Sequence, residues 1–298
     1  MTTEHAARAA APLAGVRVVT IAVNLPGPVA AARLASLGAD VTSVLPPAGD
    51  PLQGAAPSYF DALHVGQRVL TLDLRQDAGR RALEGLLADA DVLLTSHRAR
   101  TLARLGLAFA DVSARHAHLC QVDIVGHAGG DADVPGHDLT YQATAGLLDP
   151  QRMPVAPYAD LAAAEQAVTA VLATLLARSR DGAGARIEVA IAAAAEQLAM
   201  PLQHGLTGAH GPLGGAHPLY AVYPASEGHV ALAALEPHFS ARLVQLLELE
   251  DVAADPPRLR RALAESFCTT TAETWEAWAR AHDLPLAAVR TSRAAAER

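Results

Sequence analysis

The sequence predicts an α/β fold, with a large domain built on a Rossmann-like parallel sheet and a second, smaller α+β domain. β-branched apolar runs alternate with helix-like segments through the first two thirds of the chain, which is typical of a layered parallel sheet. Between Gln203 and Pro218 the composition changes to Gly, His and Pro, as in a loop or a domain boundary. With 298 residues, 51% of them hydrophobic, the chain can fill large cores. We therefore expect one domain over residues 1–203 and another over 204–298.

The first elements form a strand, a turn and a helix in succession. Val16 to Ile21 is a β-branched run, and the helix-like segment Val29 to Leu37 follows a turn that ends in Pro28. Proline is favoured in the first helical turn and glycine directly after the last, so Gly38 marks the end of this helix. Ala39 to Val44 then predicts the next strand and completes a βαβ unit.

The same alternation continues as far as the change in composition. Further strands are predicted at Val69–Leu74, Val92–Thr95, Leu119–Ile124 and Arg186–Ile191, and helices at Ala78–Ala88, His137–Leu148 and Leu161–Arg178. The second domain is predicted to contain strands at Tyr220–Tyr223 and His229–Ala233 and helices near Pro237–Leu247, Pro257–Phe267 and Ala272–Ala281.

Composition argues against several functional classes. The formal charge of −8, without a cluster of Lys and Arg, disfavours nucleic acid as a partner, because binding phosphates requires grouped cations. Cys120 and Cys268 are too few for a disulfide framework or a cysteine-based metal site, and a reducing cytoplasm fits them. Met1 to Gly15 lacks an apolar signal core, so we expect a frayed lead. The apolar run Leu161 to Ala177 contains Glu165, which suits a buried helix better than a membrane span.

Three polar residues are candidates for chemistry, although each also has a purely structural explanation. His137 stands at the start of a predicted helix and is one of thirteen histidines. Asp160 lies one residue before an apolar helix, where aspartate is a preferred N-cap. Glu236 precedes Pro237 between a strand and a helix, where an acid complements the helix dipole. Position alone does not separate these explanations from a catalytic role.

Several short motifs follow one another in the first predicted domain. They include Leu25-Pro26-Gly27-Pro28, Leu37-Gly38-Ala39-Asp40-Val41, Pro46-Pro47-Ala48-Gly49-Asp50-Pro51 and Leu70-Thr71-Leu72-Asp73-Leu74. In these motifs, their order and their spacing the chain resembles the class III CoA-transferase family, and the resemblance extends from Pro12 to about Thr291. It implies a class III CoA-transferase-like fold.

Three further motifs are similar to those of the α-methylacyl-CoA racemase branch of that family. They are Gly136-His137-Asp138, Ala159-Asp160 and Leu235-Glu236-Pro237. Racemisation beside a thioester needs a base on one face of the α-carbon, an acid on the other and stabilisation of the enolate between them. The resemblance implies that His137, held by Glu236, serves one face and that Asp160 serves the other. A free backbone N–H of Asp160, at a helix start, is further expected to face the enolate oxygen.

The resemblance also implies a CoA-bearing substrate and no separate cofactor or metal. Arg68 and Arg98 are the candidates for the CoA phosphates, and surface placement is the alternative for both. Family members form interlocked homodimers, so a homodimer is expected here. The family's final segment, which returns to the first domain, has no apparent counterpart within these residues.

Three functions remain open at this point. The first is a racemase or epimerase of a 2-methylacyl-CoA or a similar α-branched thioester. The second is a CoA transferase, in which the aspartate that Asp160 resembles is the nucleophile. The third is a relative that acts on a non-CoA substrate or serves as a non-catalytic binding subunit, which the loss of basic residues along the expected CoA path favours.

Overall fold

A computed structural model of the chain describes residues 11–290, and residues 1–10 of the expected N-terminal lead lie outside them. The chain divides into two compact units, Met1–Ala199 and Met200–Arg298. The boundary expected after Gln203 falls at the last residue of helix α10 (Ile191–Gln203). Each unit has a hydrophobic core of its own.

The first unit contains the expected parallel sheet. Its six strands are β1 (Arg17–Thr20), β2 (Asp40–Leu45), β3 (Arg68–Thr71), β4 (Val92–Thr95), β5 (Cys120–Val125) and β6 (Arg186–Ala190). Their order is β3-β2-β1-β4-β5-β6, and every neighbouring pair is parallel. The strand order changes direction between β1 and β4, and ligands of open parallel sheets bind outside the carboxyl ends of the strands at such a point.

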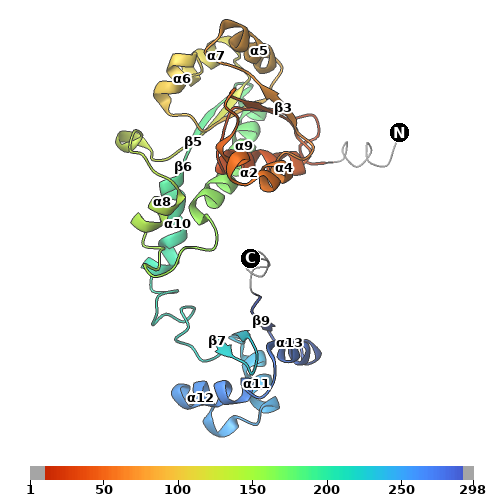
Figure 1. Cartoon of the computed structure of the whole chain (residues 1–298), viewed down its shortest axis with the longest axis vertical. Coiled ribbons are helices and arrows are strands. Elements are labelled where there is room, and N and C mark those ends of the chain that lie inside the picture. Colours follow the sequence, from red (N-terminus) through yellow and green to blue (C-terminus); the bar gives the residue numbers. More distant parts are fainter. Residues whose placement is uncertain (1–10, 291–298) are drawn as a thin grey trace, which may run out of the picture. The chain divides into compact units, whose positions relative to one another are not determined.

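Helices cover both faces of this sheet (Figure 1). Successive strand residues point to opposite faces. Val18 packs with α2 (Pro26–Ser36) and α9 (Tyr158–Asp181), whereas Val19 packs with α5 (Asp77–Ala88), α6 (Ala99–Leu105) and α7 (Phe109–Arg115). These α/β layers confirm the fold class that the sequence predicts.

Helix α9 is the longest helix of the described chain. By length and composition alone its 24 residues could cross a membrane. Ala163, Ala167 and Val171, however, are buried in the core shared with α2 and the sheet. That packing agrees with the expectation of a core helix.

Several short helices are absent from the sequence prediction. They are α3 (Pro51–Ala55), α4 (Pro57–Leu63), α6 and α7. The longer helix α10 was not predicted either: it follows β6 directly and begins at Ile191, which was expected to end the strand. Each of the four short helices is only five to seven residues long, too short to show a helical repeat of apolar residues. The helix expected at His137–Leu148 is also shorter, because α8 covers only Asp138–Thr144.

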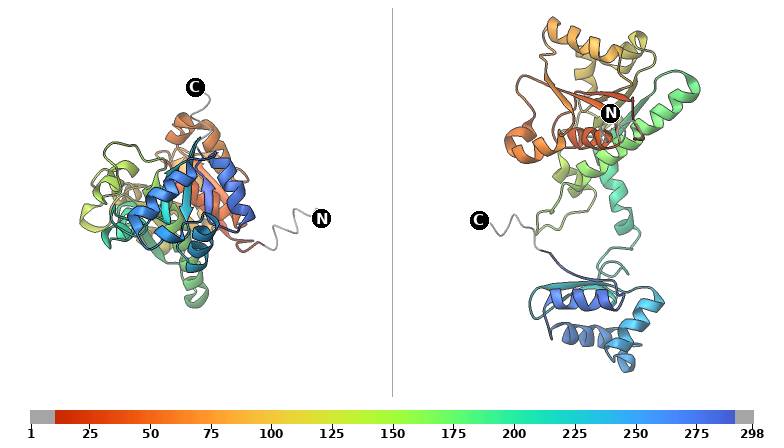
Figure 2. Two further views of the ribbon diagram at one scale, coloured as in Figure 1. Left: turned by 90° about the horizontal axis from the view of Figure 1, so that it is seen from below. Right: turned by 90° about the vertical axis from the view of Figure 1, so that its right-hand side faces the viewer.

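The second unit contains a three-stranded antiparallel sheet in the order β7 (Tyr220–Pro224), β8 (His229–Ala233) and β9 (Leu286–Ala288). In β8 buried and exposed residues alternate, so the strand presents one face to a core. The helices α11 (Pro237–Leu246), α12 (Pro256–Phe267) and α13 (Ala272–Ala281) gather on that side of the strands (Figure 2, right). Strand β9 was not predicted, because three residues give no recognisable alternation.

Candidate active site

A cavity of about 290 Å³ lies in the first unit at the carboxyl ends of its strands. Val23 and Asn24 follow β1, Ser96 follows β4, and Gly126 follows β5, so the cavity occupies the place where the strand order changes direction. Its polar lining consists of Asn24, Ser96, Arg98, His137, Tyr141, Asp160 and Glu188. The structure therefore brings two of the three sequence candidates, His137 and Asp160, to one cavity.

His137 is the N-cap residue of α8, in an extended conformation. Its backbone N–H donates to Oγ1 of Thr140 at 3.0 Å, and that hydroxyl lies 2.8 Å from the carbonyl oxygen of His137. The residue is exposed within this unit, and its imidazole lines the cavity. The first turn of α8 thus fixes the backbone of His137, whereas the ring remains available to a ligand.

Asp160 is not the N-cap that the sequence suggests. Helix α9 begins at Tyr158 with Pro157 as its N-cap, so Asp160 lies in the first helical turn. Burial raises the pKa of its carboxyl group to about 7, and the negative charge of Asp138 adds to the increase. At neutral pH both the acid and the carboxylate are therefore populated, as proton transfer in both directions requires.

Asp138, rather than Asp160, caps the start of α9. Its Oδ1 accepts the backbone N–H of Ala159 at 2.9 Å and that of Asp160 at 3.1 Å. A side chain that accepts amides of a first turn does the work of a helix cap. The N–H of Asp160 is consequently occupied, which corrects the expectation that it faces an enolate oxygen.

Sequence reasoning missed Tyr141 as a lining residue. Tyr141 is buried on α8, one helical turn after His137, and a β-carbon at Gly126 or Gly136 would meet its phenol ring. Burial raises the pKa of Tyr141, the charge of Asp160 raises it further, and Arg98 opposes both effects. The spacing of four residues from His137 is the signal in the sequence that could have identified it.

The loop after β1 was also missed. Asn24 has a φ of 70°, which is uncommon for a residue with a side chain. Two neighbours hold this loop: Asp50 Oδ1 accepts the N–H of Asn24 at 3.1 Å, and Ser96 Oγ accepts the N–H of Val23 at 3.0 Å. Strained residues that are held in place in this way concentrate at functional sites.

The two arginines predicted to contact CoA lie at opposite ends of the parallel strands. Arg98 lines the cavity with His137 and Asp160. Arg68 begins β3 and lines a hollow at the amino ends of β1, β2 and β3, so the structure does not bring it to the cavity. Its role as a CoA contact stays a prediction.

A second hollow of about 340 Å³ adjoins the cavity at the carboxyl ends of the strands, and Val23 lines both. Its walls are mostly apolar, and its charged lining residues are Asp73, Arg75 and Arg104. Asp73 binds Arg75 through both carboxylate oxygens, at 2.9 and 3.2 Å. These two arginines are basic candidates that the sequence analysis did not name.

Glu236, the third candidate, belongs to the second unit. It is the N-cap residue of α11, it is exposed, and no side-chain capping bond involves it. Its place at the start of α11 agrees with the structural alternative, in which its charge complements the helix dipole without a side-chain hydrogen bond. Its partnership with His137 stays a prediction.

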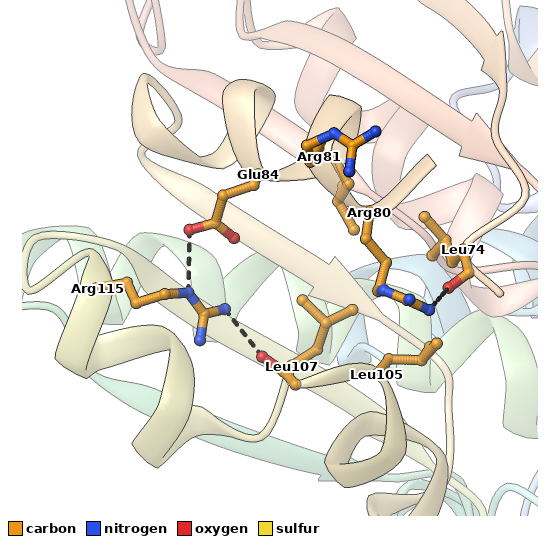
Figure 3. A pocket seen from close by; sticks show the side chains of 9 residues that line it. Leu74, Arg80, Arg81, Glu84, Leu105, Leu107 and Arg115 are labelled. Carbon is orange, nitrogen blue, oxygen red and sulfur yellow. Dashed lines mark hydrogen bonds and ion pairs between the residues drawn. The ribbon is translucent and has the colours of Figure 1, made fainter. Parts of the chain in front are cut away.

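A separate hollow between α5 and the α6–α7 region contains none of the sequence candidates (Figure 3). Arg115 donates to Glu84 at 3.0 Å and to the carbonyl of Gly106 at 2.9 Å. Arg80 donates to the carbonyls of Leu74 and Arg75 at 3.2 and 3.0 Å. These two guanidinium groups hold neighbouring segments together, which explains them without a ligand.

No group of three or more His, Cys, Asp or Glu side chains within residues 11–290 is placed to hold a metal ion. Cys120 is buried in the sheet core and Cys268 is exposed, and both are free thiols. The polar groups of the two adjoining cavities are the imidazoles of His97 and His137, carboxyl groups, hydroxyls, an amide and guanidinium groups.

Comparison with known proteins identifies the family. The model of CoA-transferase family III matches residues 13–298, and the chain belongs to this family. A crystal structure of a CAIB/BAIF family protein from Brucella suis is 27% identical and superposes with a TM-score of 0.79, over 94% of this chain and 84% of that one. A hypothetical protein from Mycobacterium tuberculosis is 26% identical, with a TM-score of 0.81 and coverages of 97% and 87%.

Curated relatives carry two kinds of activity in their names. Alpha-methylacyl-CoA racemase of Mus musculus is 30% identical over 88% of this chain and 74% of its own length. Succinate–glutarate CoA-transferase of Agrobacterium fabrum is 29% identical over 82% and 68%. A subunit of a succinyl-CoA:(R)-benzylsuccinate CoA-transferase of Thauera aromatica is 32% identical over 74% of this chain and only 59% of the relative. Members of the family are thus enzymes of acyl-CoA chemistry.

Proposed function

We propose that this protein is a racemase or epimerase of an α-branched, 2-methylacyl-type CoA thioester, and that it works by 1,1-proton transfer through an enolate. The observation that carries the proposal is the shared cavity of His137 and Asp160, in which the carboxyl group has a pKa of about 7. An imidazole and such a carboxyl group can each take or give a proton near neutral pH.

The reaction follows from these two groups. One removes the α-proton, and the electrons of the C–H bond move into the thioester carbonyl to form an enolate. The other group then gives a proton to the opposite face of the same carbon. In the reverse direction the two groups exchange roles, so each must be stable in both protonation states, and burial of Asp160 provides this for the carboxyl group.

The substrate's CoA portion requires anionic recognition near this cavity. Arg98 lies in the cavity itself, and the adjoining hollow offers Arg104 beside apolar walls, whereas Arg75 in that hollow is already paired with Asp73. Guanidinium groups bind phosphates well because their donors match the phosphate oxygens. We propose that the nucleotide part of CoA occupies the adjoining hollow and that the thioester reaches the cavity past Val23. No further cofactor is needed for this chemistry.

The second candidate is a CoA transferase with Asp160 as the nucleophile. The names of two relatives favour it. A nucleophilic carboxylate must be ionised, and the raised pKa of Asp160 leaves a large part of it protonated at neutral pH. This protonation, together with His137 in the same cavity, supports proton transfer over attack on the thioester.

Incubation with 2-methylbutanoyl-CoA in D2O distinguishes the two reactions. A racemase incorporates deuterium at the α-carbon without any acceptor acid, which mass spectrometry detects. We expect His137→Ala to lower racemisation by about 10²–10⁴-fold, the range for the loss of an acid–base group. If deuterium is not incorporated and CoA instead moves from succinyl-CoA to free glutarate, the transferase proposal replaces this one.

A further inference from the structure

Asp138 lies where the two candidate groups meet. It follows His137 as the first residue of α8, and its Oδ1 accepts two backbone N–H groups of the first turn of α9, including that of Asp160. Its Oδ2 accepts Nε2 of Gln142, at 2.6 Å, from the next turn of α8. A single carboxylate therefore connects the beginnings of both helices.

Hydrogen bonds hold this carboxylate from two sides. Charge-assisted hydrogen bonds of this kind are stronger than neutral ones, and the start of a helix favours an anion. Gln142 is completely buried, and its Oε1 has no hydrogen-bond partner within residues 11–290. The orientation of the glutamine amide is consequently set by Asp138, together with the carbonyl oxygen of Ala156, which accepts the same Nε2 at 3.4 Å.

The same carboxylate lies close enough to Asp160 to disfavour its ionised form, which adds to the effect of burial. Other charged or titratable groups share the cavity with Asp160. These are His137 and Tyr141 at α8, Arg98 before α6 and Glu188 in β6. Among these neighbours and Asp138, the negative charge of Asp138 is the one that adds to the effect of burial on the pKa of Asp160.

We propose that Asp138 is a positioning residue, which fixes the first turn of α9 against the start of α8 and, through its own negative charge, adds to the effect of burial in favouring the protonated form of Asp160. The positioning role concerns structure alone. The electrostatic role matters for catalysis only if the proposed function holds, because a carboxyl group that takes and gives protons works best when its pKa lies near the ambient pH.

Asp138→Asn separates charge from hydrogen bonding. The amide oxygen still accepts from Ala159 and Asp160, and Gln142 can turn its amide so that Oε1 accepts the new N–H. The fold should therefore persist while the charge is removed. We expect the pKa of Asp160, followed by NMR titration of its carboxyl carbon, to fall by about one unit, a tenfold change in proton affinity, because burial still keeps it raised.

Asp149→Asn is the matched control. It removes an equal charge from an exposed loop residue outside the cavity. Oδ1 of Asp149 accepts the N–H of Gln151 at 2.9 Å, a bond that an amide oxygen retains. We expect the pKa of Asp160 to be unchanged in this variant. If Asp138→Asn shifts that pKa no more than the control does, the electrostatic half of the proposal is wrong.

Asp138→Ala tests the positioning half, because it removes the acceptor as well as the charge. We expect the amides of Ala159 and Asp160 to exchange with solvent about tenfold faster in this variant, and at the original rate in Asp138→Asn. Unchanged exchange in Asp138→Ala overturns this half.

Both readouts are independent of catalysis. If the wild-type protein incorporates no α-deuterium, the proposed function fails while the titration and amide exchange still decide the role of Asp138. If the enzyme is active, the limb of the pH–rate profile that reports Asp160 should move to lower pH in Asp138→Asn by the same amount as the pKa. An unshifted limb together with a lowered pKa would mean that Asp160 does not control the rate.

Discussion

The buried position of Asp160 lowers the free energy of unfolding at neutral pH. The raised pKa means that the native state retains a proton between about pH 4 and pH 7, where the unfolded chain has lost it. Stability then decreases as pH rises through this window and stays low above it. Groups tuned for chemistry commonly carry such a cost.

Asp160→Asn should therefore stabilise the protein above pH 7 and have little effect near pH 4. Each pKa unit corresponds to about 1.4 kcal/mol, so we expect a gain of about 1–4 kcal/mol at pH 8 in denaturant unfolding. Glu165→Gln, an exposed acid on the same helix, is the control and should change stability at neither pH. An equal effect of Asp160→Asn at both values of pH would contradict the raised pKa.

The roles of the site residues were only partly predictable from the sequence. Asp160 and His137 could be named from their motifs, and both line the cavity. The hydrogen bonds of Asp138 span more than twenty positions of sequence and depend on how α8 meets α9, which no local pattern encodes. The capping role was consequently assigned to the wrong aspartate.

At the scale of elements, Tyr141 and two glycines shape the wall of the cavity. A β-carbon at Gly136 would meet two ring carbons and the hydroxyl oxygen of Tyr141, and one at Gly126 would meet the hydroxyl oxygen. Tyr141 is buried, so the ring has little room to move aside. The absence of side chains at these two positions is what allows the loops after β5 and before α8 to approach α8 closely.

We expect Gly136→Ala to displace Tyr141 and to destabilise the protein by about 1–3 kcal/mol, the usual range for overpacking. Thermal unfolding measures the effect. Gly130→Ala is the matched control, because a β-carbon there meets nothing within 4 Å. Equal unfolding temperatures of the two variants would mean that the tyrosine adapts without cost.

Elements with a strong local pattern were predictable. The strands at Val92–Thr95 and His229–Ala233 and the helix Ala272–Ala281 have the expected bounds. Strand β9 is three residues long and depends on its pairing with β8, which its own residues do not indicate. Helix α3 has no buried residue and no apolar repeat, and its only local signal is the N-cap Asp50 followed by Pro51.

At the scale of the whole molecule, the resemblance implies a dimer in which the large domain of one chain and the small domain of its partner share a site. Glu236 would then act on the His137 of the partner subunit. Light scattering should give the mass of two chains, and a monomeric mass would contradict this expectation.

Mixed dimers test the sharing of sites directly. In a heterodimer of one His137→Ala chain and one Glu236→Ala chain, a shared arrangement leaves one site with both native residues. We expect such heterodimers, isolated with two different tags, to recover about half of the wild-type exchange rate although each homodimer is impaired. Absence of recovery would indicate that His137 and Glu236 of the same chain work together. A Glu236→Ala homodimer with full activity would mean that Glu236 has no role.

The central claim is that His137 and Asp160 serve opposite faces of one carbon, and α-hydrogen exchange of separate enantiomers tests it most directly. With (R)- and (S)-2-methylbutanoyl-CoA in D2O, we expect His137→Ala to lose exchange of one enantiomer and Asp160→Asn to lose exchange of the other, because each variant retains the base for one face. Equal loss of exchange for both enantiomers in both variants, or full exchange in either variant, would contradict the two-base account.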